Sequence, residues 1–109
     1  MAHTLSTHVL DTTLGRPAQG MKLTLCTDKG EVLAQAETDA DGRFREWPEA
    51  HFHDGVYTLT FHTGAYLKAH HGQAFYPEAS VCFELSGEPA HYHVPLLISP
   101  FGYSTYRGS

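Results

Sequence analysis

Histidine is the residue type with the greatest capacity for chemistry in this chain, and nine of its 109 residues are histidines. An imidazole exchanges a proton near neutral pH, which suits it to general acid–base catalysis and to metal binding. His91 and His93 lie two residues apart in an alternating run, so in a β-strand both side chains point to the same face. The opposite face of that run is apolar and consists of Tyr92, Val94, Leu96 and Ile98. We therefore expect both histidines to point away from the core.

A third histidine, His8, follows the same pattern near the N-terminus. Leu5 and Val9 share one parity of an alternating run and His8 has the other, so a core on the Leu5 side directs His8 outward. Three interpretations are open: separate surface histidines, a zinc site made by His8, His91 and His93, or a general base with an orienting partner at a hydrolytic site. Residue types and spacing alone do not decide among them.

Arg43 directly follows a tight-turn sequence at 39–42, so it is expected at the mouth of a strand pair. It is either a solvated surface charge or a ligand for the carbonyl oxygens of a planar, oxygen-rich substrate, to which a forked guanidinium is suited. The turn resembles the beginning of a calcium-binding loop, but the remaining ligand positions and the closing glutamate are missing. Residues 39–42 are therefore expected to form a turn only.

Period-two alternation dominates the chain and turn signals recur at short intervals, which is typical of an all-β sandwich. One short helix is expected at Ala65–His71, ended by Gly72. Gly15–Pro17 is expected to mark a loop, and Trp47–Gly55 to be a surface connection. Eight strands are expected, at Leu5–Leu10, Met21–Thr27, Glu31–Thr38, Arg43–Arg45, Val56–Thr63, Ser80–Leu85, His91–Ser99 and Tyr103–Arg107.

The bulk properties exclude several classes of partner. The length predicts a single domain, residues 1–109. A net charge of -5 without a basic run argues against a nucleic-acid partner, and no apolar stretch approaches the ~20 residues of a membrane span. The N-terminus has neither the basic nor the apolar region of a secretory signal. Cys26 and Cys82 occupy polar positions of expected strands, so we expect reduced thiols and a cytoplasmic location.

Five blocks of sequence resemble the 5-hydroxyisourate hydrolase family, and the resemblance runs essentially from end to end. The most specific is the terminal Tyr106-Arg107-Gly108-Ser109, because the transthyretin branch of the family lacks it. The blocks are residues 5–11 with 15–18, residues 38–43, residues 55–57, the HYHVPLL sequence at 91–97, and residues 102–109. The resemblance implies a transthyretin-like, all-β sandwich of two four-stranded sheets with one short helix after the fifth strand. In that topology the first, seventh and eighth strands share a sheet.

The resemblance also implies which residues catalyse the reaction and which bind the substrate. The family's catalytic residues map onto His8, Arg43 and His93, with Ser109 completing the pocket. His8, Arg43 and Tyr106 are the implied substrate-binding residues, and His91 is expected at the rim. Neither a metal nor an organic cofactor is implied. Members of the family assemble as homotetramers, dimers of dimers, so each active site is expected at a subunit interface.

The implied reaction is hydrolytic opening of the six-membered ring of 5-hydroxyisourate to 2-oxo-4-hydroxy-4-carboxy-5-ureidoimidazoline, a step of urate degradation. His8 and His93 would form the acid–base pair, and Arg43 would stabilise the developing negative charge. The rival functions are a transthyretin-type carrier of thyroid hormone and a zinc-binding protein that uses the three histidines. The implied topology also separates Cys26 from Cys82 by one strand, roughly 9.5 Å at two strand spacings, which is too far for a disulfide.

Overall fold

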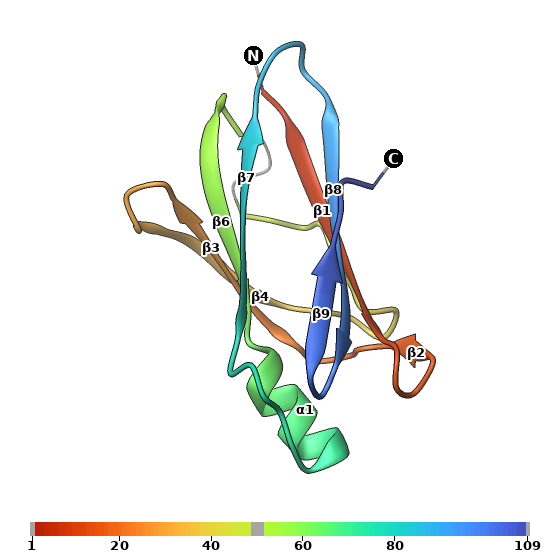
Figure 1. Cartoon of the computed structure of the whole chain (residues 1–109). Helices are drawn as coiled ribbons and strands as arrows, with labels where there is room; N and C mark the ends of the chain where they lie inside the picture. The colour runs from red at the N-terminus through yellow and green to blue at the C-terminus, as the bar shows by residue number, and fades with distance from the viewer. Residues whose placement is uncertain (1, 49–51, 109) are drawn as a thin grey trace.

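Two β-sheets pack face to face, with one helix beyond one end of the strands (Figure 1). The computed structural model describes residues 2–48 and 52–108. Within these residues the elements are β1 (Thr4–Asp11), β2 (Arg16–Pro17), β3 (Lys22–Thr27), β4 (Val32–Glu37), β5 (Arg43–Phe44), β6 (Gly55–Phe61), α1 (Thr63–His71), β7 (Ala79–Leu85), β8 (His91–Ser99) and β9 (Gly102–Thr105). This architecture confirms the expected all-β sandwich with one short helix.

The sheet that concerns function has the order β2-β1-β8-β9, and β5 adds to it by pairing with β1. The first, seventh and eighth expected strands, now β1, β8 and β9, do share this sheet. β1 and β8 run parallel, with Thr4 opposite His91 and Ser6 opposite His93. The second sheet has the order β4-β3-β6-β7.

The expected loop at Gly15–Pro17 contains the short strand β2, which makes this sheet five-stranded rather than four-stranded. The chain reverses after Asp11, whose carboxylate accepts hydrogen bonds from the Thr13 and Leu14 amides at 3.0 and 3.1 Å. Gly15 completes the reversal with φ 72°, a conformation that favours glycine. Arg16 and Pro17, which form β2, then pair with the end of β1. Alternation is not detectable over so short a strand, so the pattern indicated only a turn.

Alternation along β1 places the core as expected. Leu5, Thr7 and Val9 are buried, whereas Ser6 and His8 on the other face are partly exposed. The inner face of β8 is likewise buried. The fully buried side chains between the sheets include Val9, Leu23, Leu25, Leu59, Phe61, Leu85, Leu96 and Ile98. Both expected core faces are confirmed, so the histidines lie on the outer side of their sheet.

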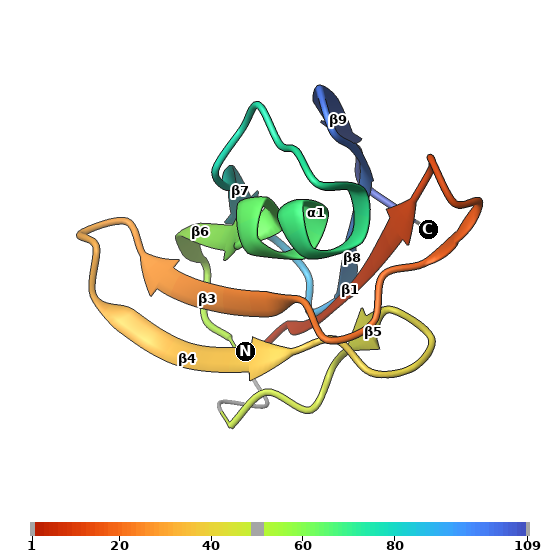
Figure 2. The same cartoon turned by 90° about the horizontal axis from the view of Figure 1, so that it is seen from below.

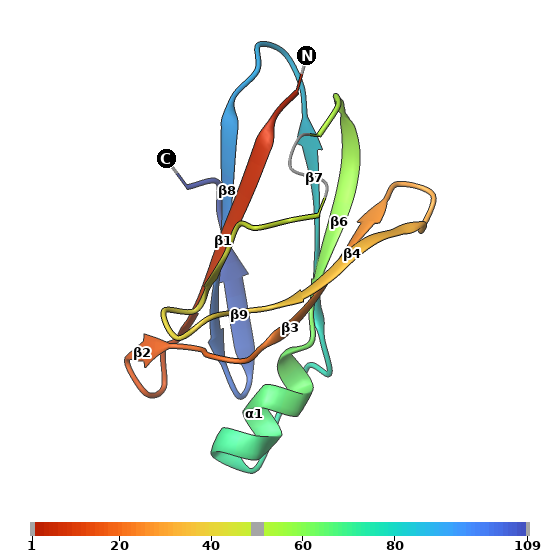
Figure 3. The same ribbon diagram turned by 180° about the vertical axis from the view of Figure 1, so that it is seen from behind.

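The expectation of a surface connection at Trp47–Gly55 is wrong for its aromatic residues. Trp47 is 4% exposed and its indole N–H donates to the Leu5 carbonyl at 3.1 Å. Phe52 is 2% exposed and pairs with His3. The segment that follows β5 crosses over β1 (Figure 3), so large side chains from irregular backbone complete the core. A periodicity criterion detects only regular elements and therefore missed them.

The helix α1 lies across the end of the sandwich (Figure 2) and begins two residues earlier than expected, at Thr63. Gly72 ends it as predicted, with φ 75° and its N–H bonded to the Lys68 carbonyl. No helix among the described residues is long and apolar enough to cross a membrane.

A buried carboxylate attaches α1 to the end of β1. Asp11 is 0% exposed and accepts from the Tyr66 hydroxyl at 3.0 Å and from His71 Nε2 at 2.8 Å. Burial acts to raise the pKa of Asp11, but the hydrogen bonds from His71, the Leu14 amide and Tyr66 outweigh it, so the pKa is lowered. Burial, followed by the bond to Asp11, raises the pKa of Tyr66 to about 12.

The two cysteines lie in β3 and β7, on either side of β6. Cys26 and Cys82 are both paired with Thr58, which confirms that one strand separates them. Both thiols are free.

Candidate active site

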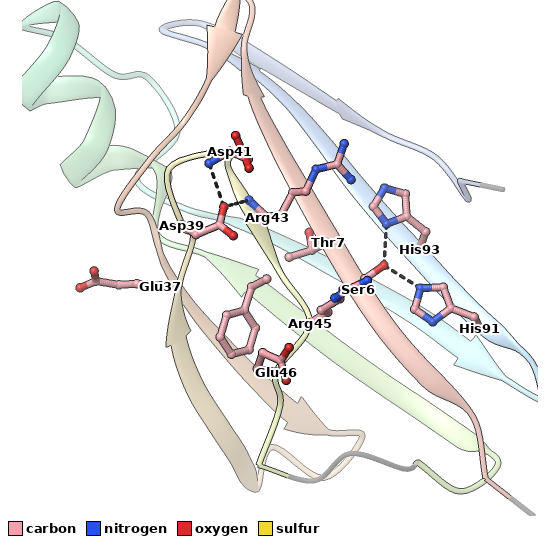
Figure 4. Close-up of a pocket in the computed structure, with 11 residues that line it drawn as sticks. Ser6, Thr7, Glu37, Asp39, Asp41, Arg43, Arg45, Glu46, His91 and His93 are labelled. Carbon is pink, nitrogen blue, oxygen red and sulfur yellow. Dashed lines mark hydrogen bonds between the residues drawn. The ribbon is translucent and has the colours of Figure 1, made fainter.

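A polar depression of about 800 Å³ opens on the outer face of the β1–β8 sheet, where β5 and its preceding turn form one wall (Figure 4). It is lined by Ser6, Thr7, Glu37, Asp39, Asp41, Arg43, Phe44, Arg45, Glu46, His91 and His93. Two of the predicted site residues, Arg43 and His93, therefore share one cavity. His8 does not line the cavity, but it lies directly opposite Arg43 in the β1–β5 pair.

The turn before β5 determines where Arg43 lies. The Asp39 carboxylate accepts from the amides of Asp41 and Arg43 at 2.9 and 3.0 Å. Gly42 adopts φ 73°, and its carbonyl accepts from the Val9 amide at 2.7 Å. These bonds fix the turn against β1, and the Arg43 side chain extends over β1 toward His93 (Figure 4). The turn is thus structural, and the exposed Arg43 side chain points across the depression toward His93.

Burial and positive charge lower the pKa of both predicted catalytic histidines. For His93 the causes are burial first, then the charges of His8, Arg43 and His91. For His8 they are burial first and then Arg43, opposed by the Asp41 backbone and by nearby carboxylates. Both imidazoles are therefore neutral at pH 7 and can accept a proton.

Hydrogen bonds orient His93 and its neighbour His91. The Ser6 hydroxyl lies 2.8 Å from His93 Nδ1 and 2.8 Å from His91 Nε2. The other nitrogen of His91, Nδ1, is 2.6 Å from the Thr4 hydroxyl. His93 Nε2 has no hydrogen bond to a described residue, so it is the nitrogen of this ring that can serve substrate or water.

The C-terminal segment returns along β8 and closes over His93. β9 pairs with β8 so that Leu96 lies opposite Thr105, and the His93–Gly108 bridge continues the same register. The Gly108 amide donates to the His93 carbonyl at 2.8 Å. A methyl group at Gly108 would overlap the His93 ring, since paired residues project to the same face. Glycine is therefore required here for close packing on the imidazole.

The other residues of the C-terminal segment, Tyr106 and Arg107, have different surroundings. The Arg107 guanidinium is 4.4 Å from the centre of the Tyr92 ring, on the inner side of β8. Tyr106, a predicted substrate-binding residue, is 58% exposed and lines a second recess of about 160 Å³, which His93 also lines. Ser109 lies outside the described residues. The roles assigned to Tyr106 and Ser109 stay predictions, as do those of His8, Arg43 and His93.

The histidines are not arranged as a metal site in the part of the chain that the structure describes. No three His, Cys, Asp or Glu side chains among residues 2–48 and 52–108 are grouped so that they could hold a metal ion. Both nitrogens of His91 already bond to hydroxyls. The geometry thus gives the zinc interpretation no support within one subunit.

Sequence reasoning missed Ser6 and the specific role of Gly108. Ser6 shares the outer face of β1 with His8, so alternation could have placed it there. Its position between two histidines depends on the parallel register of β1 and β8, which no local pattern reveals. The sequence marks Gly108 only as part of a terminal motif.

Comparison with known proteins identifies the class to which this fold and site belong. A family model described as the HIUase/Transthyretin family matches residues 5–108, and the chain belongs to that family. The "5-hydroxyisourate hydrolase" of Salmonella dublin is 44% identical over an alignment 109 residues long, and the match covers 96% of this chain and 80% of the relative.

Solved structures from both branches of the family share the fold. The Klebsiella pneumoniae 5-hydroxyisourate hydrolase is 42% identical with a TM-score of 0.89, and the match covers 98% of this chain and 99% of that one. Transthyretin from Sparus aurata is 32% identical with a TM-score of 0.88, and the match covers 96% of each chain. The fold alone therefore does not separate an enzyme from a carrier, and the residues of the depression must do so.

Proposed function

We propose that this protein hydrolyses 5-hydroxyisourate in urate degradation. The observation that carries the proposal is the convergence of a neutral histidine, His93, and the Arg43 guanidinium on one polar depression. A planar substrate rich in carbonyl groups suits the forked donors of arginine. The similar proteins from Salmonella dublin and Klebsiella pneumoniae carry the same activity in their names.

In the proposed reaction water attacks a ring carbonyl and loses a proton to a histidine. The oxygen of that carbonyl becomes an oxyanion, which the Arg43 guanidinium stabilises. The ring C–N bond then breaks to give a carboxylate, and the leaving nitrogen receives a proton from the acid–base pair. His8 and His93 form this pair, while Tyr106 and Ser109 contribute to substrate binding at the chain end. The chemistry proceeds without a metal or organic cofactor.

We propose further that the protein works as a homotetramer, a dimer of dimers, with each site at a subunit interface. The depression lies on the outer face of a sheet, where a second subunit can cover it. Phe75, Phe101 and Tyr103 are 68%, 64% and 42% exposed, and Tyr76 stacks edge-on against Tyr103 at 5.2 Å. Such a patch is typical of surfaces that associate. The unpaired cysteines support a cytoplasmic location.

The test is an assay on freshly generated 5-hydroxyisourate, followed by its ultraviolet absorbance and corrected for spontaneous opening. The unaltered protein should accelerate the decay. His8→Ala, Arg43→Ala and His93→Ala should each lower turnover by about 10²-fold or more while the protein stays folded. His53→Ala changes an exposed histidine in the segment between β5 and β6. It is the matched control and should leave turnover unchanged. Decay at the unaltered rate in all three site variants contradicts the assignment.

The carrier function predicts a different outcome of the same experiment. A thyroid-hormone carrier should bind thyroxine tightly and leave 5-hydroxyisourate decay at its spontaneous rate. A zinc protein should contain stoichiometric metal when purified without a histidine tag and lose its activity in chelator.

A further inference from the structure

A continuous row of hydrogen bonds leads from the depression to the rim of the site. It joins His93 Nδ1, the Ser6 hydroxyl, the two nitrogens of His91 and the Thr4 hydroxyl. The three N···O separations are 2.8, 2.8 and 2.6 Å. Because His93 is partly buried and His91 is exposed, the row connects the site to solvent.

The chemistry of the hydroxyl gives this row a direction. A serine hydroxyl has one proton, so Ser6 donates to one of its two imidazole partners and accepts from the other. When Ser6 donates to His91, His93 carries its proton on Nδ1 and presents a free lone pair at Nε2. When Ser6 donates to His93, the proton of the His93 ring is on Nε2 instead. The first arrangement makes His93 a base toward the depression and the second makes it an acid.

We propose that Ser6 and His91 form a proton relay that switches His93 between its base and acid forms. The inference rests on the proposed function, because it assigns these two residues to act through His93. Neither of them needs to touch the substrate, so both are positioning and proton-conducting residues.

The relay carries one proton outward from His93 and later returns it. Water gives a proton to His93 Nε2 as its oxygen bonds to the carbonyl carbon. The Nδ1 proton of His93 passes to the Ser6 oxygen while the hydroxyl proton of Ser6 passes to His91 Nε2. His93 is then neutral with a proton on Nε2, which it can donate to the leaving nitrogen, and His91 is the cation. His91 keeps the extra proton until His93 has given its Nε2 proton to the leaving nitrogen. The reverse shift then passes the His91 Nε2 proton to the Ser6 oxygen and the Ser6 hydroxyl proton to His93 Nδ1, which restores the starting arrangement.

Electrostatics favours the outward transfer. A cation on His93 faces Arg43 from β5 and His8 from β1, and these charges, after burial, lower the pKa of His93. The relay moves the positive charge one step along β8, to an exposed ring at the rim of the depression. The carboxylates that line the cavity, Glu37, Asp39, Asp41 and Glu46, lie on the β4–β5 side.

The positions of the relay residues follow from strand pairing. Thr4 and His91 are directly opposite in the parallel β1–β8 pair, and so are Ser6 and His93. Each of the four side chains lies on the outer face of its strand. The row is therefore held by two central strands and does not depend on a loop.

The test uses three variants in the full-length protein, assayed for kcat and KM at pH 7. Ser6→Ala removes the connection, Ser6→Thr keeps a hydroxyl, and His91→Gln keeps a polar group without a titratable ring. Ser80→Ala is the matched control, because it removes a comparable hydroxyl bond, to Thr60 at 3.0 Å, on the other sheet. We expect Ser6→Ala and His91→Gln to lower kcat by about tenfold, part of the roughly 10²–10⁴-fold effect of general acid–base catalysis. KM should change little, and Ser6→Thr and Ser80→Ala should retain kcat.

Added imidazole buffer separates a relay from a structural role. A small base in solution can replace a missing relay, so kcat of His91→Gln and Ser6→Ala should rise with imidazole at constant pH and ionic strength, after subtraction of the buffer-dependent blank. The unaltered enzyme should show no such dependence. Unchanged kcat in both variants overturns the relay, and so does a loss that imidazole does not restore. If Ser6→Ala does not fold, the exposed His91→Gln decides alone. Failure of the proposed function is distinct, because the unaltered protein would then show no hydrolysis.

Discussion

At the scale of single residues, the neutral state of His8 and His93 is the property that matters for catalysis. Both pKa values lie below that of a free imidazole, through burial first and the positive charge of Arg43 among the further causes. A base with a lowered pKa stays unprotonated to a lower pH. The acidic limit of activity should therefore fall below the ordinary histidine value of about 6.5.

Removing the charge of Arg43 should raise the pKa of both histidines. In Arg43→Gln we expect the imidazole titrations of His8 and His93, followed by NMR of the ring protons, to move to higher pH. Arg43→Lys keeps the charge and is the control, in which the titrations should stay near those of the unaltered protein. Turnover should fall in both, because lysine lacks the forked donors. Titrations that do not move in Arg43→Gln contradict the electrostatic role.

Gly108→Ala should displace the His93 ring, since the added methyl group overlaps it. A displacement of about 1 Å at a catalytic group costs about 10²-fold in rate, so kcat should fall by up to that factor. Gly102→Ala is the control, because nothing but the Ser99 hydroxyl, at 3.9 Å, lies near a methyl group there. Equal kinetics of the two variants would show that the close packing of Gly108 on His93 has no function.

At the scale of elements, the end of β1 is coupled to the helix. The buried Asp11 carboxylate accepts hydrogen bonds from the Thr13 and Leu14 amides in the β1–β2 turn. It also accepts hydrogen bonds from Tyr66 and His71 in α1. One side chain thus fixes two elements at the end of the strand that carries His8.

Asp11→Ala should lower the free energy of unfolding by about 2–3 kcal/mol, because a charged acceptor with several buried partners is lost. Urea unfolding at pH 7 measures this loss. Asp28→Ala, at an exposed turn position, should change stability by less than about 0.5 kcal/mol. A loss in Asp11→Ala no larger than that of the control is the contrary result.

The lowered pKa of Asp11 gives this stabilisation a defined pH range. It is fully present above the ordinary carboxyl value of 3.8 and is lost as pH falls through the lowered pKa. His8 and His93 affect the stability of the fold in a higher pH range. Below about pH 6.5 the unfolded chain binds protons on these residues while the folded chain does not, so stability should already decline there. Thermal unfolding measured between pH 7 and 3 should show both declines, and His8→Gln should reduce the first.

At the scale of the whole molecule, the site is open on one side in a single chain. The depression lies on an outer sheet face, and the exposed aromatic residues Phe75, Phe101 and Tyr103 lie apart from it. The proposed tetramer would bury this patch and cover the site with a second subunit.

Dilution should therefore lower the activity per chain. We expect specific activity to fall at the concentration at which the oligomer dissociates, measured by analytical ultracentrifugation, and a dilute monomer to be inactive. Addition of the catalytically weak His93→Ala protein, which can supply the missing neighbouring surface, should restore activity to the diluted chain. Constant specific activity across the dissociation would locate the complete site in one subunit.

The sequence by itself determined which faces the side chains take. Alternation placed Leu5 and Val9 inward and His8, His91 and His93 outward, because the side-chain period of a strand is local and needs no partner strand. The sequence also predicted every strand longer than two residues in the part of the chain that the structure describes. It predicted the end of α1 at Gly72 as well, since glycine is favoured in the left-handed conformation there.

Only the tertiary structure decided which of these side chains meet. Ser6 and His93 are 87 residues apart, and their contact depends on the parallel register of two strands that local patterns do not encode. The same holds for Arg43 opposite His8, for Gly108 on the His93 ring, and for the buried Trp47 in an irregular segment. Long-range pairing is selected by the packing of the whole core, so the histidines became a site only when the sandwich was assembled.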